Sequence, residues 1–182
     1  MLFAPDVEVA LISAAALANL GPGDGRLPDV AALDEFVEHY RYSGERTRDD
    51  AELRAVRALI PTLRRYWELD DEAALVDYVN ELLRAGHALP QLRKHDEWDW
   101  HLHAEPPGAG LAQRMLVESA MAMTDVIRAG ELDRLKFCAD EHCDNVVIDL
   151  SKNRSRRFCE AGCGNRANVA AYRARQKQAA GG

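Results

Sequence analysis

Hydrophobic residues recur at helical spacing over most of the first 130 positions of the chain. Apolar residues three and four positions apart form one face of a helix, and aspartates suit its start because their carboxylates accept hydrogen bonds from free backbone N–H groups. The pattern predicts helices over 7–20, from Asp29 to Gly44, from Asp49 or Asp50 to Leu69, from Asp70 or Asp71 to near Gly86, and over 109–129. We therefore expect a mainly α-helical domain over residues 1–130.

Residues 97–103 follow a two-residue period instead. One face would carry Trp98, Trp100 and Leu102, and the other Asp99, His101 and His103. This alternation predicts a half-buried strand, with residues 88–93 as its partner in a small β-hairpin. Two histidines at positions i and i+2 of a strand can share a metal ion. His101 and His103 are therefore a candidate ligand site, and the alternative is an exposed polar strand face.

All four cysteines of the chain lie near its C-terminal end, at Cys138, Cys143, Cys159 and Cys163. The spacing is C-x4-C, fifteen residues, then C-x3-C. Two close pairs separated by a medium loop predict a tetrahedral site for one structural Zn²⁺ with four thiolate ligands. Such a site is closed and has no open position for a catalytic water. His142 could replace a thiolate, but four cysteines make it an exposed turn residue.

Two other uses of four cysteines remain as alternatives. A pair of disulfides is unusual in a chain that carries no secretory signal, since the cytoplasm keeps thiols reduced. An iron–sulfur cluster also takes four thiolates, but this spacing matches no ferredoxin pattern.

Charge divides the chain into an acidic and a basic part. Met1 to Asp133 holds 13 Lys and Arg against 25 Asp and Glu, whereas Arg134 to Gly182 holds 10 against 5. An acidic body with a basic tail is typical of nucleic-acid binding, and arginines grip phosphate oxygens with paired hydrogen bonds. The predicted nucleic-acid contacts are Lys152, Arg154, Arg156, Arg157, Asn165, Arg166, Arg173 and Arg175. In the alternative interpretation, these cations offset the negative charge of a zinc–thiolate centre.

The short β-branched run at 146–148 predicts a strand, and the Ala-rich segment after Cys163 predicts a helix. A knuckle, a hairpin and a helix that starts at the last ligands form a treble-clef-like zinc finger. The expected fold class is thus mainly α with a small β-hairpin, a helical N-terminal domain followed by this finger.

The stretch from Arg134 to Lys177 resembles the CGNR zinc finger. It carries SKNRSRRFC at 151–159, the CGNR tetrad at 163–166 and an AxYRxR helix segment at 170–175, in that order. The preceding body is similar to the ABATE domain in its element order, its WDWHLH strand and its long last helix. The family is described as stress-induced bacterial transcription regulators. The resemblance implies a DNA-binding finger over 134–178 and a helical domain that senses a ligand.

These observations favour a DNA-binding transcription regulator of the cytoplasm over an enzyme. The chain has no Gly-rich phosphate loop, no HExxH motif and no serine–histidine–acid order, and no apolar run long enough to span a membrane. We expect DNA as the partner, a small-molecule effector and a homodimer formed through the helical domain. The alternatives are a small-molecule or metal-binding protein or enzyme with a purely structural finger, and an RNA-binding finger.

Overall fold

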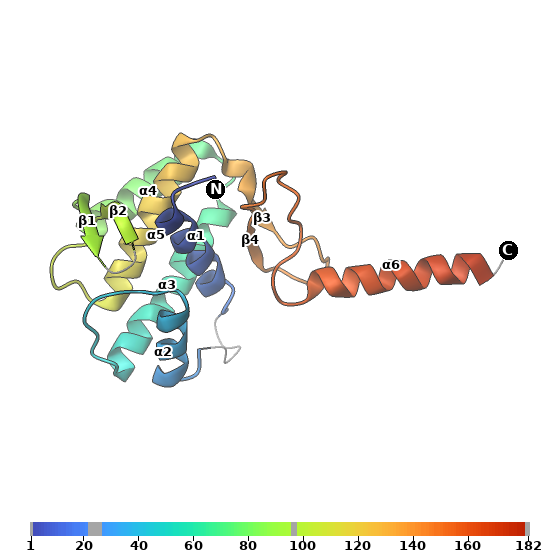
Figure 1. Ribbon diagram of the computed structural model, residues 1–182, viewed down its shortest axis with the longest axis horizontal. Coiled ribbons are helices and arrows are strands. Elements are labelled where there is room, and N and C mark those ends of the chain that lie inside the picture. Colours follow the sequence, from blue (N-terminus) through green and yellow to red (C-terminus); the bar gives the residue numbers. More distant parts are fainter. Residues whose placement is uncertain (1, 22–26, 96–97, 181–182) are drawn as a thin grey trace. The chain divides into compact units, whose positions relative to one another are not determined.

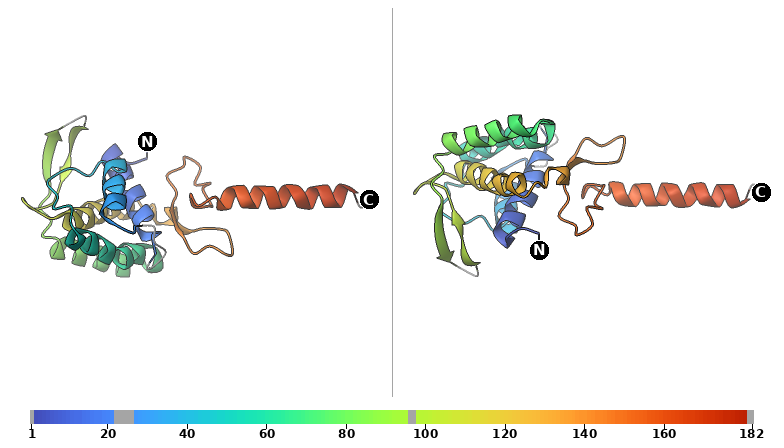
Figure 2. Two further views of the ribbon diagram at one scale, coloured as in Figure 1. Left: turned by 90° about the horizontal axis from the view of Figure 1, so that it is seen from below. Right: turned by 90° about the horizontal axis from the view of Figure 1, so that it is seen from above.

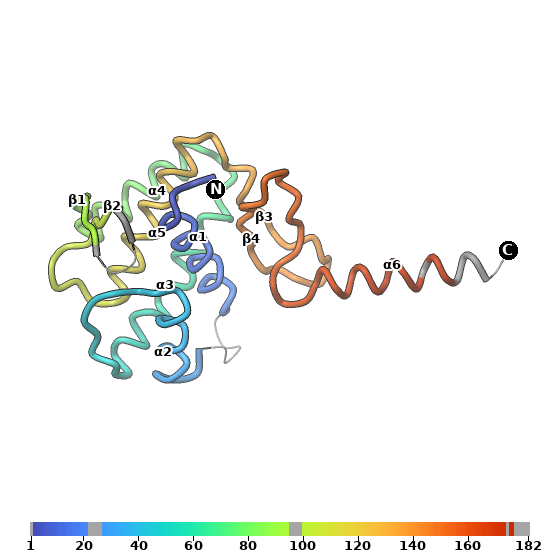
Figure 3. The backbone as a smooth tube through the Cα atoms, in the orientation of Figure 1, coloured from blue at the N-terminus to red at the C-terminus, as the bar shows by residue number. Residues whose placement is uncertain are grey.

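A computed structural model describes residues 2–21, 27–95 and 98–180. The chain forms two compact units, Met1–Leu132 and Asp133–Gly182. Within the described residues there are six α-helices, a short 3-10 helix at Leu132–Arg134 and two antiparallel hairpins. Figures 1 and 3 label the α-helices and strands along the chain. The predicted fold class, mainly helical with a small hairpin and a four-cysteine finger, is confirmed.

The first unit contains five of these helices. They are α1 (Pro5–Ala18), α2 (Val30–His39), α3 (Asp50–Glu68), α4 (Glu72–Ala85) and α5 (Leu111–Arg128). Asp29, Asp49 and Asp71 cap α2, α3 and α4, because each carboxylate accepts a hydrogen bond from the N–H three residues later. The aspartates therefore start these helices as their positions predict.

The core of this unit lies around α5, which contacts α1, α3 and α4. Its largest fully buried side chains come from four helices, namely Leu11, Leu17, Leu33, Val56, Leu63, Tyr66, Leu111, Met115, Val117, Met123 and Val126. The buried Tyr66 hydroxyl lies 3.3 Å from Ser119 Oγ, so this polar atom keeps a partner inside the core.

The predicted end of α2 at Gly44 is wrong, because the helix ends at His39. Arg41 takes a positive φ of 57°, and the N–H groups of Arg41 and Tyr42 donate to the carbonyls of Glu38 and Val37. This pairing terminates a helix with a left-handed residue, a place that glycine usually fills. The sequence gives no glycine signal there, since an arginine takes the conformation.

The hairpin of the first unit consists of β1 (Gln91–His95) and β2 (Trp98–His103), so the predicted strand exists. In β2 the apolar face is exposed and the face with the histidines is half-buried, which is the reverse of a strand that buries its apolar side. Trp100 is 68% exposed and Leu102 48%, whereas His101 and His103 are half-buried. The side chains of Trp98 and Asp99 lie outside the described part of the chain. His101 and His103 are therefore less exposed than a fully solvated polar strand face would be.

The second unit holds β3 (Leu135–Phe137), β4 (Val146–Ile148) and α6 (Cys163–Ala180). β3 and β4 form an antiparallel hairpin, and the unit's buried cluster consists of Cys138, Val147, Cys159 and Cys163 with Cys143 and Phe158 packed against it. Figure 2 shows α6 running straight out from the loops of this unit. The cysteines themselves thus make up most of this cluster, and β4 adds the buried Val146 and Ile148.

Candidate metal centre and basic surface

The four cysteine sulfurs converge on one point of the second unit. All four lie within 4.8 Å of one another, with 3.7 Å between the Sγ atoms of Cys143 and Cys159 and 3.5 Å between those of Cys159 and Cys163. A tetrahedral ion with metal–sulfur bonds of about 2.3 Å would separate its sulfurs by about 3.8 Å. All four thiols are free, so the disulfide alternative does not fit. The cluster is a possible metal site.

The chemistry of the sulfurs also fits a cation. Burial opposes ionisation of Cys159, but the Ala161 N–H and the Asn145 amide stabilise its thiolate and lower its pKa to about 7. Burial and the neighbouring thiols raise the pKa of Cys163. Four thiolates this close repel one another unless a positive ion lies between them, and a bound metal supplies that charge.

Arg166, the arginine of the CGNR tetrad, binds the metal centre. Its Nη2 lies 2.8 Å from Cys163 Sγ and 3.2 Å from Asp140 Oδ2, while Nη1 donates to the Ala161 carbonyl at 3.1 Å. The Arg166 and His142 N–H contacts lower the pKa of Asp140, with the His142 bond contributing most. Arg166 thus ties one ligand to the knuckle between the first two cysteines, a contact that the nucleic-acid prediction for Arg166 did not include.

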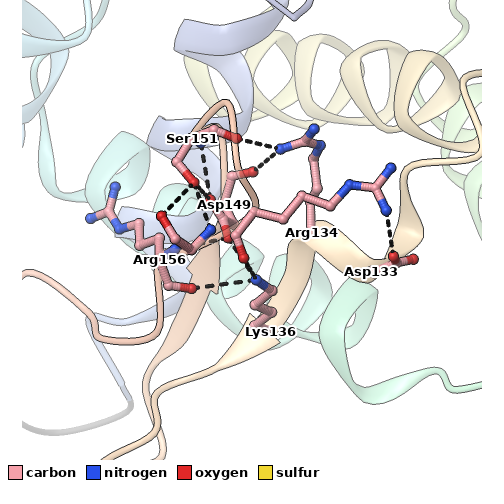
Figure 4. Close-up of polar contacts among 8 residues, drawn as sticks. Asp133, Arg134, Lys136, Asp149, Ser151 and Arg156 are labelled. Carbon is pink, nitrogen blue, oxygen red and sulfur yellow. Dashed lines mark hydrogen bonds and ion pairs between the residues drawn. The ribbon is translucent and has the colours of Figure 1, made fainter.

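A second set of contacts fixes the polar loop that follows β4, and sequence reasoning missed it (Figure 4). Asp149 is fully buried, and its carboxylate accepts from Lys136 Nζ at 2.6 Å and from the Arg156 N–H at 3.0 Å. The same carboxylate accepts from the N–H and hydroxyl of Ser151 at 3.0 and 2.5 Å. Arg134 donates to the carbonyls of Asp149 and Ser151. Asp149 therefore positions the loop that carries the basic residues.

The eight residues predicted to contact nucleic acid lie on two connected segments. Lys152, Arg154, Arg156 and Arg157 lie in the loop between β4 and α6, and Asn165, Arg166, Arg173 and Arg175 lie on α6. Arg156 is half-buried and the other seven are exposed. The structure thus brings all eight onto the surface of the finger unit.

Some of these cations have partners within the unit. Arg154 Nη1 lies 2.7 Å from Asp133, Arg156 Nη2 lies 2.9 Å from Glu160, and the Arg157 guanidinium lies 5.7 Å from the centre of the Phe158 ring. Across the described residues, Lys152, Arg173 and Arg175 make no ion pair. Arg173 and Arg175 are therefore the guanidinium groups of α6 most available to an external anion.

His101 and His103 face a separate cavity of about 110 Å³ inside the helical unit. Their Nε2 atoms are 2.9 Å apart, and Nδ1 of His103 contacts the Glu105 carboxylate. The cavity wall also includes Tyr42, whose hydroxyl lies 2.7 Å from Ser13 Oγ. Among the described residues, the four cysteines form the group of three or more side chains that could hold a metal ion. The histidine pair thus lines a cavity but does not complete a metal site.

The fold and the cysteine cluster define a helical domain followed by a small metal-binding finger. A comparison with protein-family models matches residues 11–130 to ABATE, described as "Putative stress-induced transcription regulator", and residues 134–176 to the CGNR zinc finger. The chain belongs to the ABATE family and carries the CGNR finger. No curated protein sequence matches it. No helix in the described residues has the length and apolarity needed to cross a membrane.

Proposed function

We propose that this protein is a transcription regulator whose zinc-bound finger binds DNA. The observation that carries the proposal is the exposed basic helix α6, which starts at a ligand of the metal centre. Every described side chain from Asn168 to Gln176 is exposed, and Arg173 and Arg175 extend from this surface. A helix with no packing partner along most of its length gains little from its own propensity, so an external partner is expected. DNA phosphates provide one, with Arg as the preferred ligand.

In this proposal one Zn²⁺ is held by Cys138, Cys143, Cys159 and Cys163. The ion would have a structural role: it replaces the missing apolar core and fixes the start of α6. Zinc rather than iron is favoured by the family of the finger, since four tetrahedral thiolates suit either metal. The Asp149 network then orients the basic loop beside the helix.

Replacing Arg166 by alanine should lower zinc affinity about 10- to 100-fold, because a partner that orients a metal ligand typically contributes that much. The loss arises at Cys163, whose sulfur would lose its charge-assisted hydrogen bond. Competition with a chromophoric chelator measures the affinity. Arg173→Ala, the same change two turns further along α6, is the control and should leave the affinity unchanged. Equal affinities for wild type and Arg166→Ala would contradict this role.

DNA binding is tested by fluorescence anisotropy with a labelled duplex at several salt concentrations. Each phosphate contact contributes about 0.9 to the slope of log K against log salt. The double variant Arg173→Ala/Arg175→Ala should therefore weaken binding and reduce the slope by about 2. Arg84→Ala/Arg128→Ala removes the same charge from exposed positions of the helical unit and is the matched control.

The outcomes separate the functions under consideration. A zinc-loaded wild-type protein that ignores duplex DNA at low salt would overturn the proposal. Tighter binding to single-stranded or hairpin RNA than to duplex DNA would instead favour the RNA-binding alternative, since the same arginines contact either backbone. A slope that falls equally in both double variants would show that net charge, rather than α6, is responsible.

A further inference from the structure

A buried arginine of the helical unit lacks a partner for half of its guanidinium. Arg114 on α5 is only 6% exposed, and its Nη1 donates to the Ala109 carbonyl at 2.6 Å. Its Nε and Nη2 atoms are buried and have no hydrogen-bond partner among the described residues. These two nitrogens form the edge of the guanidinium that binds a carboxylate or phosphate with two parallel hydrogen bonds. An unpaired charge buried in this way is costly.

In a neighbouring arginine, Arg46, the Nε–Nη2 edge of the guanidinium is hydrogen-bonded to a carboxylate. Arg46 donates from Nε and Nη2 to Glu52 at 3.1 and 2.7 Å, and from Nη1 to Asp34 at 2.5 Å. Arg46 and Arg114 both line one open groove of about 1020 Å³. Arg46 is therefore paired with two carboxylates, whereas Arg114 is paired with none among the described residues.

The carboxylates around the groove do not compensate Arg114. Glu52 is bound by Arg46, Glu105 contacts His103, and Glu45 is exposed. Glu118 follows Arg114 by one turn of α5 without an ion pair between them in the described structure. Burial, and after it the nearby Glu105 charge, raises the pKa of Glu118 to about 8 against the opposing effect of the Arg114 charge, so its carboxyl is mostly neutral at pH 7.

The groove also contains the N-terminus of α5. Gly110 caps this 18-residue helix without a side-chain hydrogen bond, and its first turn contains no acidic residue. The amides of Leu111, Ala112 and Gln113 lack intrahelical acceptors, and the helix dipole favours an anion beside them. Gly44, at φ +94°, lies against the guanidinium: a Cβ there would be 3.2 Å from Arg114 Cζ. The helix end and Arg114 thus line one groove, and the unpaired Nε–Nη2 edge lies buried in its wall.

We propose that this groove binds a small-molecule oxyanion, a carboxylate or a phosphate, through the Nε–Nη2 edge of Arg114 and the first amides of α5. Exposed Arg93, which also lines the groove, adds positive charge. The site lies wholly within the helical unit, so it does not depend on DNA binding by the finger. Resting on the proposed function as a regulator, this inference assigns the small-molecule effector to the class of oxyanions.

The test is a thermal denaturation series on the intact zinc-loaded protein at constant ionic strength. Inorganic phosphate and acetate are the two anion probes, and acetamide is the neutral control for acetate. An anion at about ten times its Kd should raise the Tm of the helical unit by about 3–5 °C. A response to phosphate alone assigns a phosphate ligand, and a response to acetate but not acetamide assigns a carboxylate.

Variants locate the response. Arg114→Met should abolish it and leave the anion-free Tm unchanged or raised, because the substitution removes an unpaired buried charge. Arg114→Lys keeps the positive charge but cannot make two parallel hydrogen bonds, so it should raise the Kd for the anion at least tenfold. This variant tests the site even if Arg114→Met does not fold. Arg173→Ala/Arg175→Ala should retain the full response, which excludes binding at the finger.

Three results would overturn the proposal. The first is no anion response in the wild type, and the second is an equal response to acetamide and acetate. The third is a Tm of Arg114→Met several degrees below wild type together with an intact phosphate response, since Arg114 would then be a structural residue. None of these results bears on whether α6 binds DNA.

Discussion

Replacing Cys163 by serine should abolish metal binding and unfold residues 133–182 while the helical unit stays folded. Cys163 is fully buried, and the cysteines supply four of the six side chains in the hydrophobic cluster around the sulfurs. A structural zinc site contributes about 10–16 kcal/mol at neutral pH, far more than the remaining apolar contacts. Metal analysis should fall from one ion per chain to none. Amide NMR signals from the finger should collapse to random-coil positions.

The position next to Cys143 offers a matched control. His142 is 87% exposed by its side chain, so His142→Ala should keep one metal ion and a folded finger. All three tryptophans lie at or before residue 100, and their fluorescence reports the helical unit separately. A Cys163→Ser protein that keeps its metal and a protected finger would contradict the four-thiolate site. Loss of metal in His142→Ala would show that this histidine is a metal ligand.

The parts of the fold that the sequence predicts are those with local causes. Asp29, Asp49 and Asp71 cap helices because each carboxylate bonds an amide three residues away. The cysteine spacing predicts convergence because each close pair lies in one short turn. Signals of this kind act over a few residues, so they can be recognised without knowing the tertiary structure.

Contacts between distant residues explain what the sequence does not predict. Arg166 meets Asp140 across 26 positions and Asp149 meets Lys136 across 13, and nothing in the spacing of either pair indicates contact. The usable signal for Asp149 was its place directly after the β-branched run at 146–148, since an acid beside a buried strand is seldom without donors. Arg114 gave no comparable signal, because its unpaired edge depends on the packing of Gly44 and α5 around it.

The β1–β2 hairpin shows a different limit of prediction from sequence, namely which face of a strand is buried. A two-residue period separates the histidines of β2 from Trp100 and Leu102, but it does not determine which face turns toward the body. Hydrophobicity favours burial of the apolar face, whereas the structure exposes it. The half-buried face instead carries His101 and His103, which line the small cavity beside α1 and α5.

Changing Asp149 to asparagine should destabilise the finger by about 2–3 kcal/mol at pH 7. Lys136, together with Ser151, lowers the pKa of Asp149 to about 2 against the opposing effect of burial. A carboxyl pKa depressed from about 3.9 to this value corresponds to about 2.5 kcal/mol. Because the folded pKa is lower than the unfolded one, this stability is present in full above about pH 4 and is lost only as the pH falls toward 2. At pH 7 the whole contribution is therefore measurable.

The physical cause lies in the four donors that meet this carboxylate. An amide at position 149 accepts with one atom only. Its NH₂ group turns either toward Lys136 Nζ and the Arg156 N–H, which share Oδ2, or toward the two Ser151 donors, which share Oδ1, and leaves buried donors unsatisfied. The measurement is a urea titration of the zinc-loaded protein, followed through the amide signals of Val146, Val147 and Ile148. The midpoint should fall without a change in the helical unit.

Asp133→Asn is the control, because it makes the same chemical change on the same network. Asp133 pairs with Arg154 at 2.7 Å, but its side chain is 67% exposed, and exposed ion pairs contribute only about 0–1 kcal/mol. The two variants should therefore differ by about 2 kcal/mol in finger stability. If Asp149→Asn also weakens DNA binding beyond what its stability loss explains, the carboxylate positions the basic loop for DNA. Equal stabilities of the two variants would show that the buried network contributes no more than a surface pair.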